Sequence, residues 1–235
     1  MKIAGRLNDI EPFRVVEVLT RAKAMEASGH SIVHLEAGEP DFVTAAPIVE
    51  AAKRALDQGW TSYSQATGIP ELKRALSDWY QDRYQLDIAS ERILITPGAS
   101  GALLLIASLL IDPGEGLLMA DPGYPCNRNF LRLVEGEGQL VPCDASTRYQ
   151  LTAENAATAW RANTRGVMVA SPANPTGEIL SREQLAELAA LCRQHEGALI
   201  VDEIYHGLDY DEKASSVLEV EPEAFVLNSF SKYFG

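Results

Sequence analysis

The sequence has few cysteines and no pattern that would pair them or bind a metal ion. Cys126, Cys143 and Cys192 are odd in number, and none of them belongs to a C-x-x-C spacing. A disulfide framework and a zinc site are therefore not indicated, and no metal is expected. All three thiols are predicted to be small buried hydrophobic side chains.

Long apolar runs and basic clusters are missing as well. The longest apolar run, 102–111, is far shorter than the roughly 18 residues that a membrane span needs. The first residues, M-K-I-A-G-R-L-N-D, contain no apolar core of a secretion signal. The 20 Lys and Arg residues face 33 Asp and Glu residues, a net charge of −13, and form no stripe that would neutralise phosphates. The sequence thus predicts a cytoplasmic protein with neither a membrane nor a nucleic-acid partner.

What is present is a regular alternation of strand and helix signals. The 235 residues, 46% of them hydrophobic, are enough to bury a substantial core in one large or two small domains. The predicted strands are short, apolar runs rich in leucine or β-branched residues. They lie at 32–35, 92–96, 117–120, 139–142, 167–170, 198–201 and 225–228.

Helical periods fill the intervals between these runs. The segment 70–84 has apolar residues three and four apart and starts at a proline, which suits a first helical turn. Another helix is predicted from the capping box that begins at Ser181 to Gly197. Alternating strands and helices predict an α/β fold, a mostly parallel sheet with helices on both faces. The segment before about residue 30 lies outside this alternation and is expected to be an arm or part of a smaller domain.

In a parallel sheet, ligands bind at the carboxyl ends of the strands, so the residues after each run are candidate site residues. Five such positions are candidates, and three of them have an ordinary structural interpretation too. The turn 97–100 could cradle a phosphate or only pack tightly, and Tyr124 could stack on a ligand or fill the core. Asp202 could hold a cationic group or be a salt-bridged surface acid. The other two candidates are Asn174, between two prolines, and Lys232.

One ligand would use all five features together. A phosphorylated aromatic aldehyde needs an anion cradle, a ring to stack on and donors for its ring oxygen. It also needs a carboxylate to keep its ring nitrogen protonated and a lysine amine to bond the aldehyde. That ligand is pyridoxal 5′-phosphate, and the strand ends predict it as the cofactor.

Seven short motifs, in order along the chain, resemble those of the class I aminotransferases. These are pyridoxal-phosphate-dependent enzymes of fold type I, the aspartate aminotransferase fold. The seven motifs cover nearly the whole chain and occur in the family's order. The resemblance is therefore specific, although each motif alone is weak. The motifs are G-E-P-D-F (38–42), S-Y-S-Q-A-T-G-I-P-E-L (62–72), T-P-G-A-S-G-A-L (96–103), D-P-G-Y-P (121–125), S-P-A-N-P-T-G (171–177), V-D-E-I-Y (201–205) and S-F-S-K (229–232).

The resemblance implies a role for each matching residue around the cofactor ring. Lys232 would hold the cofactor covalently and then act as the catalytic base, and Asp202 would keep the ring nitrogen protonated. Asn174 and Tyr205 would hydrogen-bond the phenolic oxygen of the ring, and Tyr124 would stack on its face. Asn174 would also border the bound substrate.

Further matching residues would surround the phosphate and the substrate. The backbone N–H groups of Ala99 and Ser100 and the hydroxyl of Ser229 would bind the phosphate, with Ser231 as a further contact. Tyr63 would reach the phosphate of a neighbouring subunit, so the resemblance implies a homodimer with shared active sites. The small residue at position 38, Gly38, would leave room for the substrate carboxylate.

The family pattern predicts a division into an N-terminal arm with part of a small domain, 1–40, and a cofactor-binding large domain, 41–235. The arginines that relatives place after the lysine have no match here, so the large domain is expected to be incomplete and the C-terminal small domain absent. The implied reaction is ping-pong transfer of an amino group from an α-amino acid to a 2-oxo acid. A lyase on the same fold, or a non-catalytic regulatory module that binds the cofactor, are the alternatives.

Overall fold

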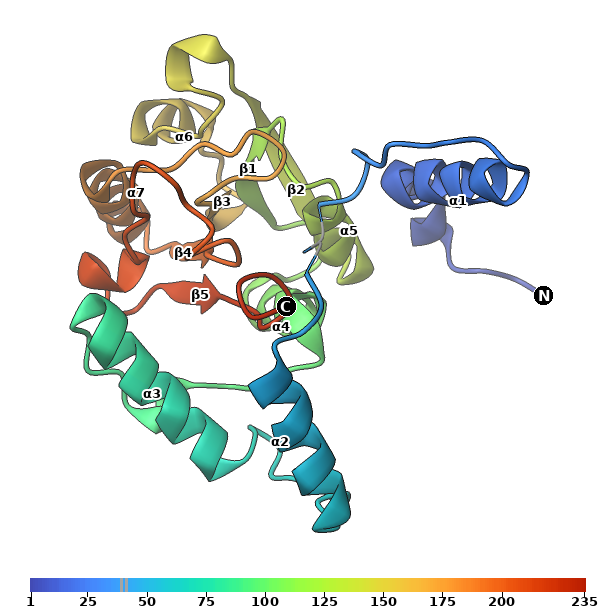
Figure 1. The fold of residues 1–235 in the computed structure, drawn as a ribbon. Helices are drawn as coiled ribbons and strands as arrows, with labels where there is room; N and C mark the ends of the chain where they lie inside the picture. The colour runs from blue at the N-terminus through green and yellow to red at the C-terminus, as the bar shows by residue number, and fades with distance from the viewer. Residues whose placement is uncertain (39, 41) are drawn as a thin grey trace.

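The computed structural model describes residues 1–38, 40 and 42–235 (Figure 1). Within them, five parallel strands form one sheet in the order β2-β1-β3-β4-β5. This confirms the α/β prediction and five of the seven predicted strands. In chain order, the helices and strands are α1 (Arg14–Ala27), α2 (Ala46–Asp57), α3 (Pro70–Tyr84), α4 (Gly98–Leu110), β1 (Gly116–Asp121), α5 (Cys126–Leu133), β2 (Glu137–Pro142), α6 (Ala153–Ala159), β3 (Thr164–Ala170), α7 (Arg182–Gln194), β4 (Ala198–Asp202) and β5 (Phe225–Leu227), with short 3-10 turns at Gly5–Asp9, Ser90–Arg92, Ala145–Thr147 and Val217–Glu219.

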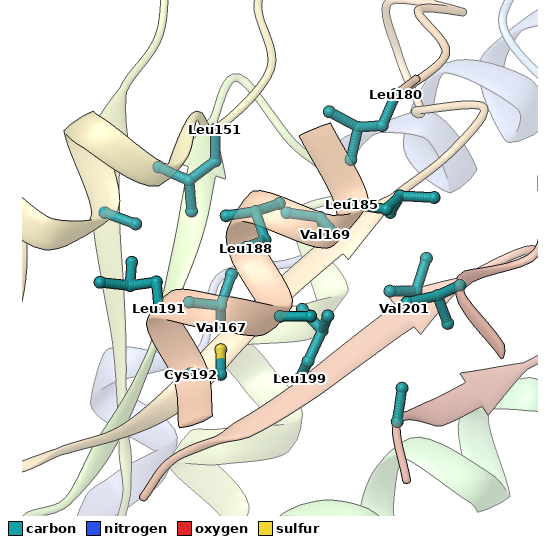
Figure 2. Close-up of a cluster of buried hydrophobic side chains, with 14 of the residues drawn as sticks. Leu151, Val167, Val169, Leu180, Leu185, Leu188, Leu191, Cys192, Leu199 and Val201 are labelled. Atoms are coloured by element: carbon teal, nitrogen blue, oxygen red, sulfur yellow. The ribbon is translucent and has the colours of Figure 1, made fainter. Parts of the chain in front are cut away.

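Alternate side chains of the strands enter two separate cores. On β3, Val167 and Val169 belong to the buried cluster beneath α6 and α7, whereas Met168 belongs to the cluster beneath α4 and α5. Figure 2 shows the first cluster, in which Leu185 and Leu188 of α7 lie over the strands. Strands buried on both faces explain why these runs are apolar throughout rather than alternating.

Local signals placed the starts of α3 and α7 correctly, whereas α7 ends at Gln194, before the predicted Gly197. Helix α3 begins at Pro70, as predicted, where the missing N–H of proline has no carbonyl to meet. At the start of α7, the Ser181 side chain accepts from the backbone of Gln184, and the Gln184 side chain accepts from the backbone of Ser181. This reciprocal pair is the predicted capping box.

Two predicted strands, 32–35 and 92–96, are wrong. Neither segment has strand pairing among the described residues, and Val33 and Leu35 are 82% and 90% exposed. In the second segment, the Ile95 N–H donates to the carbonyl of Thr67 at 3.0 Å. One hydrogen bond of this kind does not make a pair of β-strands. An apolar β-branched run becomes a strand only beside another strand, and local composition does not supply that partner.

The N-terminal segment lies outside the sheet, with α1 to one side of the layered body (Figure 1). An ion pair of 2.7 Å between Asp9 and Arg132 joins this segment to α5. Of the described helices, none has the length and apolar character that crossing a bilayer requires. Cys143 and Cys192 are buried as predicted, but Cys126, at the start of α5, is only partly buried.

Candidate active site

The strand order reverses between β1 and β3, and a cavity lies at that point. After β1 the chain runs through α5 to β2, then returns through α6 to β3 on the other side of β1. Such a reversal opens a crevice at the carboxyl ends of the two strands. A cavity of about 200 Å³ occurs there, and the residues that line it include Asp121, Tyr124, Arg128, Gln150 and Asn174.

Asp202 ends β4, the next strand in the sheet, and its carboxylate is held away from water. The Ile204 N–H donates to its Oδ1 at 3.1 Å. Burial raises the pKa of Asp202 to about 6 because a charged carboxylate loses hydration there. No ion pair to this carboxylate occurs among the described residues, so the surface salt-bridge interpretation does not apply. A partly buried acid with one backbone donor is suited to a cationic group on a ligand.

Asn174 and Tyr205 meet beside this carboxylate. The Asn174 Nδ2 donates to the Tyr205 hydroxyl oxygen at 3.3 Å. Burial, followed by the nearby charge of Asp202, raises the pKa of Tyr205, although the Asn174 hydrogen bond opposes the rise. The Tyr205 hydroxyl therefore stays protonated at neutral pH, and its hydrogen remains available to an acceptor on a ligand.

Lys232 reaches the same region from the loop after β5. Its Nζ donates to the carbonyl of Gly38 at 3.0 Å and lies 5.8 Å from the centre of the Tyr205 ring. The structure thus brings Gly38 and Lys232 together, 194 residues apart in the chain. The two acidic positions of the G-E-P-D-F motif, Glu39 and Asp41, lie outside the described residues.

The predicted phosphate cradle opens helix α4. Ala99 and Ser100 occupy its second and third positions, where backbone N–H groups have no carbonyl one turn earlier to bond. Gly98 has φ +70°, which turns the chain into the helix. After β5, the Ser231 N–H donates to the Ser229 hydroxyl at 3.2 Å, and the two hydroxyls lie 3.0 Å apart. Helix α4 packs against β5, the strand that precedes Ser229.

Tyr124 has a neighbour that the sequence did not indicate. The edge of the Phe13 ring packs on Tyr124 with the ring centres 5.8 Å apart. Burial, and then the adjacent Cys126 thiol, raise the pKa of Tyr124, with smaller effects from Tyr205 and Asp202. Phe13 immediately precedes α1, so the N-terminal segment contacts the site directly.

Tyr63 is not brought to the site by the described residues. It lies in the segment between α2 and α3, and its side chain is fully exposed. None of the contacts described for the chain joins it to Lys232 or Asp202. Its predicted role across a subunit boundary remains a prediction.

The loop that carries Lys232 rests against a glycine. Gly207 has φ +94°, a conformation that L side chains rarely adopt. A Cβ added there would lie 2.6 Å from Cδ2 of Tyr233, the residue after Lys232. The absence of a side chain at position 207 lets this loop approach β4.

A second carboxyl, Glu203, lies behind Asp202. Its residue is 1% exposed, and one oxygen accepts from the Val217 N–H at 2.7 Å and from the Ser216 hydroxyl at 3.1 Å. The other oxygen has no hydrogen-bond partner among the described residues. Burial raises the pKa of Glu203 to about 8, so the carboxyl is protonated at neutral pH.

Glu203→Gln is expected to reduce the pH dependence of stability. The folded chain holds the Glu203 proton more tightly than the unfolded chain, whose carboxyl titrates near 4.5. Its contribution to the free energy of unfolding is therefore full below that pH and declines as the pH rises through about 8. Glutamine matches the protonated form and has no such decline. Urea unfolding from pH ~5 to ~9 measures this, with exposed Glu212→Gln as the control, and an unchanged slope in Glu203→Gln would contradict the assignment.

The model of the family described as aminotransferase class I and II matches residues 30–235. The chain belongs to this family. A class I and II aminotransferase that it resembles is the valine–pyruvate aminotransferase of Mycobacterium tuberculosis. The two are 40% identical over 227 residues, which is 96% of this chain and 58% of the relative. Another is the (5-formylfuran-3-yl)methyl phosphate transaminase of Methanocaldococcus jannaschii, which is 35% identical to this chain. The alignment covers 99% of this chain and 60% of the relative.

Solved structures agree with the family assignment and with the predicted aspartate aminotransferase fold. An aminotransferase from Mycobacterium tuberculosis matches with a TM-score of 0.95 and 39% identity. The aspartate aminotransferase of Thermus thermophilus with maleate matches with a TM-score of 0.94 and 32% identity. Each match covers 100% of this chain, and 60% and 62% of the two solved chains respectively. The chain therefore spans about 60% of the length of the relatives it matches.

Proposed function

We propose that the protein carrying this chain is a pyridoxal-phosphate-dependent aminotransferase. The observation that supports this best is the convergence of Lys232, Asp202, Asn174 and Tyr205 at the carboxyl ends of neighbouring strands. An amine, a partly buried acid and two hydrogen-bonding groups are the chemistry that this cofactor needs. The family assignment supports the same reaction.

The described residues fit the cofactor. The Asp202 carboxylate, with a single backbone donor, can pair with a protonated ring nitrogen, which would lower its raised pKa again. The hydroxyl hydrogen of Tyr205 and an amide hydrogen of Asn174 are available to the ring oxygen. The N–H groups of Ala99 and Ser100, with the Ser229 hydroxyl, would bind the phosphate dianion at the helix start. Lys232 would hold the aldehyde carbon through its amine.

Lys232 is the residue that we assign to proton transfer. When bound, the cofactor supplies an acceptor for the electron pair left at the substrate α-carbon. The Lys232 Nζ would take up the α-hydrogen of the substrate and hold it for return within the site. Asp202 and Tyr205 would orient the cofactor ring, and Tyr124 would stack on its face.

The proposed substrates are an α-amino acid and a 2-oxo acid. We further propose that residues 41–235 form the cofactor-binding large domain, that residues 1–40 form an N-terminal arm and part of a smaller domain, and that two copies share their active sites. The contact between Phe13 and Tyr124 supports an arm that borders the substrate.

A substrate panel tests the proposed function. The protein carrying this chain is loaded with pyridoxal phosphate and mixed with single amino acids, and the products are analysed by mass spectrometry. An aminotransferase yields pyridoxamine phosphate and a 2-oxo acid in equal amounts. Release of ammonia with the cofactor unchanged would indicate a lyase instead, and no product from any amino acid would favour a non-catalytic module.

Tyr63→Phe is expected to weaken cofactor retention without altering the fold. Loss of one hydrogen bond to the phosphate of a neighbouring subunit should lower affinity by about tenfold, the scale of a hydrogen bond to a charged group. Equilibrium dialysis against pyridoxal phosphate measures the change, and Tyr210→Phe, at another fully exposed tyrosine, is the control. Equal affinity in both variants, or a fully active monomer, would remove Tyr63 from this role.

A further inference from the structure

His206, the residue after Tyr205, is buried in a chain of hydrogen bonds behind the site. Its residue is 3% exposed. Its Nε2 lies 2.9 Å from the carbonyl oxygen of Ser171, and its Nδ1 lies 2.7 Å from the Tyr84 hydroxyl. The Arg83 Nε donates to the same hydroxyl at 3.1 Å. These contacts join α3 to the loop that follows β3.

The partners of His206 fix its tautomer. A carbonyl oxygen only accepts, so Nε2 must carry the hydrogen that Ser171 receives. In a neutral ring Nδ1 is then an acceptor, and the Tyr84 hydroxyl donates to it. The Tyr84 oxygen in turn accepts from Arg83. The hydrogen bonds are therefore donated in one direction, from Arg83 to Tyr84, from Tyr84 to His206 and from His206 to Ser171. Burial lowers the pKa of His206 to about 4, which keeps the ring neutral at physiological pH.

The second buried group near the imidazole does not disturb this arrangement. Glu203 Oε2 lies 3.6 Å from His206 Nδ1, too far for a hydrogen bond. At neutral pH burial leaves the Glu203 carboxyl protonated and the imidazole neutral, so the two do not form an ion pair. The imidazole is therefore available to the Ser171 carbonyl.

Ser171 opens the loop that carries Asn174. The Ser171 N–H donates to the Asp202 carbonyl at 3.0 Å, and the Ser171 hydroxyl accepts from the Leu180 N–H at 2.9 Å. His206 binds the remaining backbone group of Ser171. Three residues later, Asn174 donates to Tyr205. Two consecutive residues after β4 thus bind two points of one loop.

We propose that His206 is a positioning residue that fixes the Asn174 loop through the Ser171 carbonyl. Its donated hydrogen bond sets the direction of the Asn174 amide, and so the strength of the hydrogen bonds that Asn174 and Tyr205 give to the ring oxygen of the cofactor. This role rests on the proposed function. Without the bond, the buried Ser171 carbonyl would lose its side-chain donor and the loop would relax.

Two substitutions separate the hydrogen bond from the volume of the ring. His206→Gln places an amide N–H near the position of Nε2 and keeps a donor for Ser171, whereas His206→Leu removes it. The control is His195→Leu, the same change at an exposed histidine after α7, where the ring stacks on Trp160 away from the site. His206→Leu is expected to lower kcat tenfold or more, and the other two variants to stay within about threefold of the unaltered protein.

A spectroscopic readout distinguishes positioning from general destabilisation. Donors to the ring oxygen favour its ionised form, so their loss raises the pH at which the visible absorbance of the bound cofactor titrates. His206→Leu should raise this midpoint in the same direction as Asn174→Ala, and adding it to Asn174→Ala should raise the midpoint no further. The proposal would be overturned if His206→Leu raised the midpoint equally in the unaltered protein and in Asn174→Ala. It would also be overturned if His206→Leu left the midpoint unchanged.

Nitrogen NMR of the histidine rings tests the geometry in the unaltered protein. It needs no bound cofactor and does not depend on whether the His206 variants fold. The proposal requires that His206 show a protonated Nε2 and an accepting Nδ1 that does not titrate down to pH ~5, and that Tyr84→Phe move only the Nδ1 resonance. A hydrogen on Nδ1 would refute the arrangement. A different result would contradict the proposed function itself, namely that the unaltered protein does not bind pyridoxal phosphate.

Discussion

Lys232→Ala is expected to abolish amino-group transfer, the largest effect of any single substitution in this chain. Under the proposed function, the change would remove both the covalent attachment of the cofactor and the base that moves the α-hydrogen. General acid–base catalysis alone contributes about 10²–10⁴-fold, so a loss on the order of 10⁴-fold or more in kcat is expected. Single-turnover kinetics with the best substrate from the panel would measure it.

Chemical labelling locates the attachment independently of turnover. Borohydride reduction of the protein loaded with pyridoxal phosphate, followed by peptide mapping, should place the label on Lys232 among the six lysines of the chain. Lys213→Ala, in the exposed loop after β4, is the control and should keep both label and activity. A label on another lysine would contradict the assignment of the base.

Asp202→Asn is expected to reduce turnover by about 10³-fold while the cofactor remains attached to Lys232. An asparagine keeps the volume and one acceptor oxygen, but it has no charge to keep the ring nitrogen protonated. Each unit of pKa at that nitrogen corresponds to about 1.4 kcal/mol of interaction. Loss of the ion pair with Asp202 would therefore lower the pKa of the ring nitrogen by several units. The ring would then accept the electron pair of the α-carbon poorly.

The comparison of kcat with cofactor content tests the role of Asp202. We expect Asp202→Asn to retain the visible absorbance of the bound cofactor and to lose kcat. Exposed Asp211→Asn is the matched control and should change neither quantity. Turnover of Asp202→Asn within tenfold of the unaltered protein would show that the carboxylate does not act on the ring nitrogen.

The sequence predicted those features that depend on local geometry. Pro70 and the Ser181 capping box fixed helix ends because their hydrogen bonds lie within one turn. Asp202 and Asn174 could be placed near each other because parallel strands end at one edge of the sheet. The same reasoning failed for 32–35 and 92–96, because a strand also requires a partner elsewhere in the chain.

Contacts between distant segments could not be predicted from the sequence. The Tyr84 and His206 side chains meet across 122 positions, and neither has a local pattern that distinguishes it from core filler. Phe13 precedes an ordinary helix, and only the fold shows that its ring packs on Tyr124. Tertiary packing decides these positions, which is why the residues that surround the site were missed, whereas the residues that end its strands could be proposed from the strand pattern.

The contact between Gly207 and Tyr233 has a consequence for how activity would respond to solution conditions. Van der Waals contact involves no titrating group and is not screened by salt, unlike an interaction between exposed charges. The Tyr233 ring also packs against the Phe234 ring, with the ring centres 5.0 Å apart, and its centre lies 5.7 Å from the Arg83 guanidinium. Ring packing therefore holds part of the loop that carries Lys232 without any charge. We expect this part of the contact to be the same at all pH values, so that a pH dependence of the proposed reaction would not come from its loss.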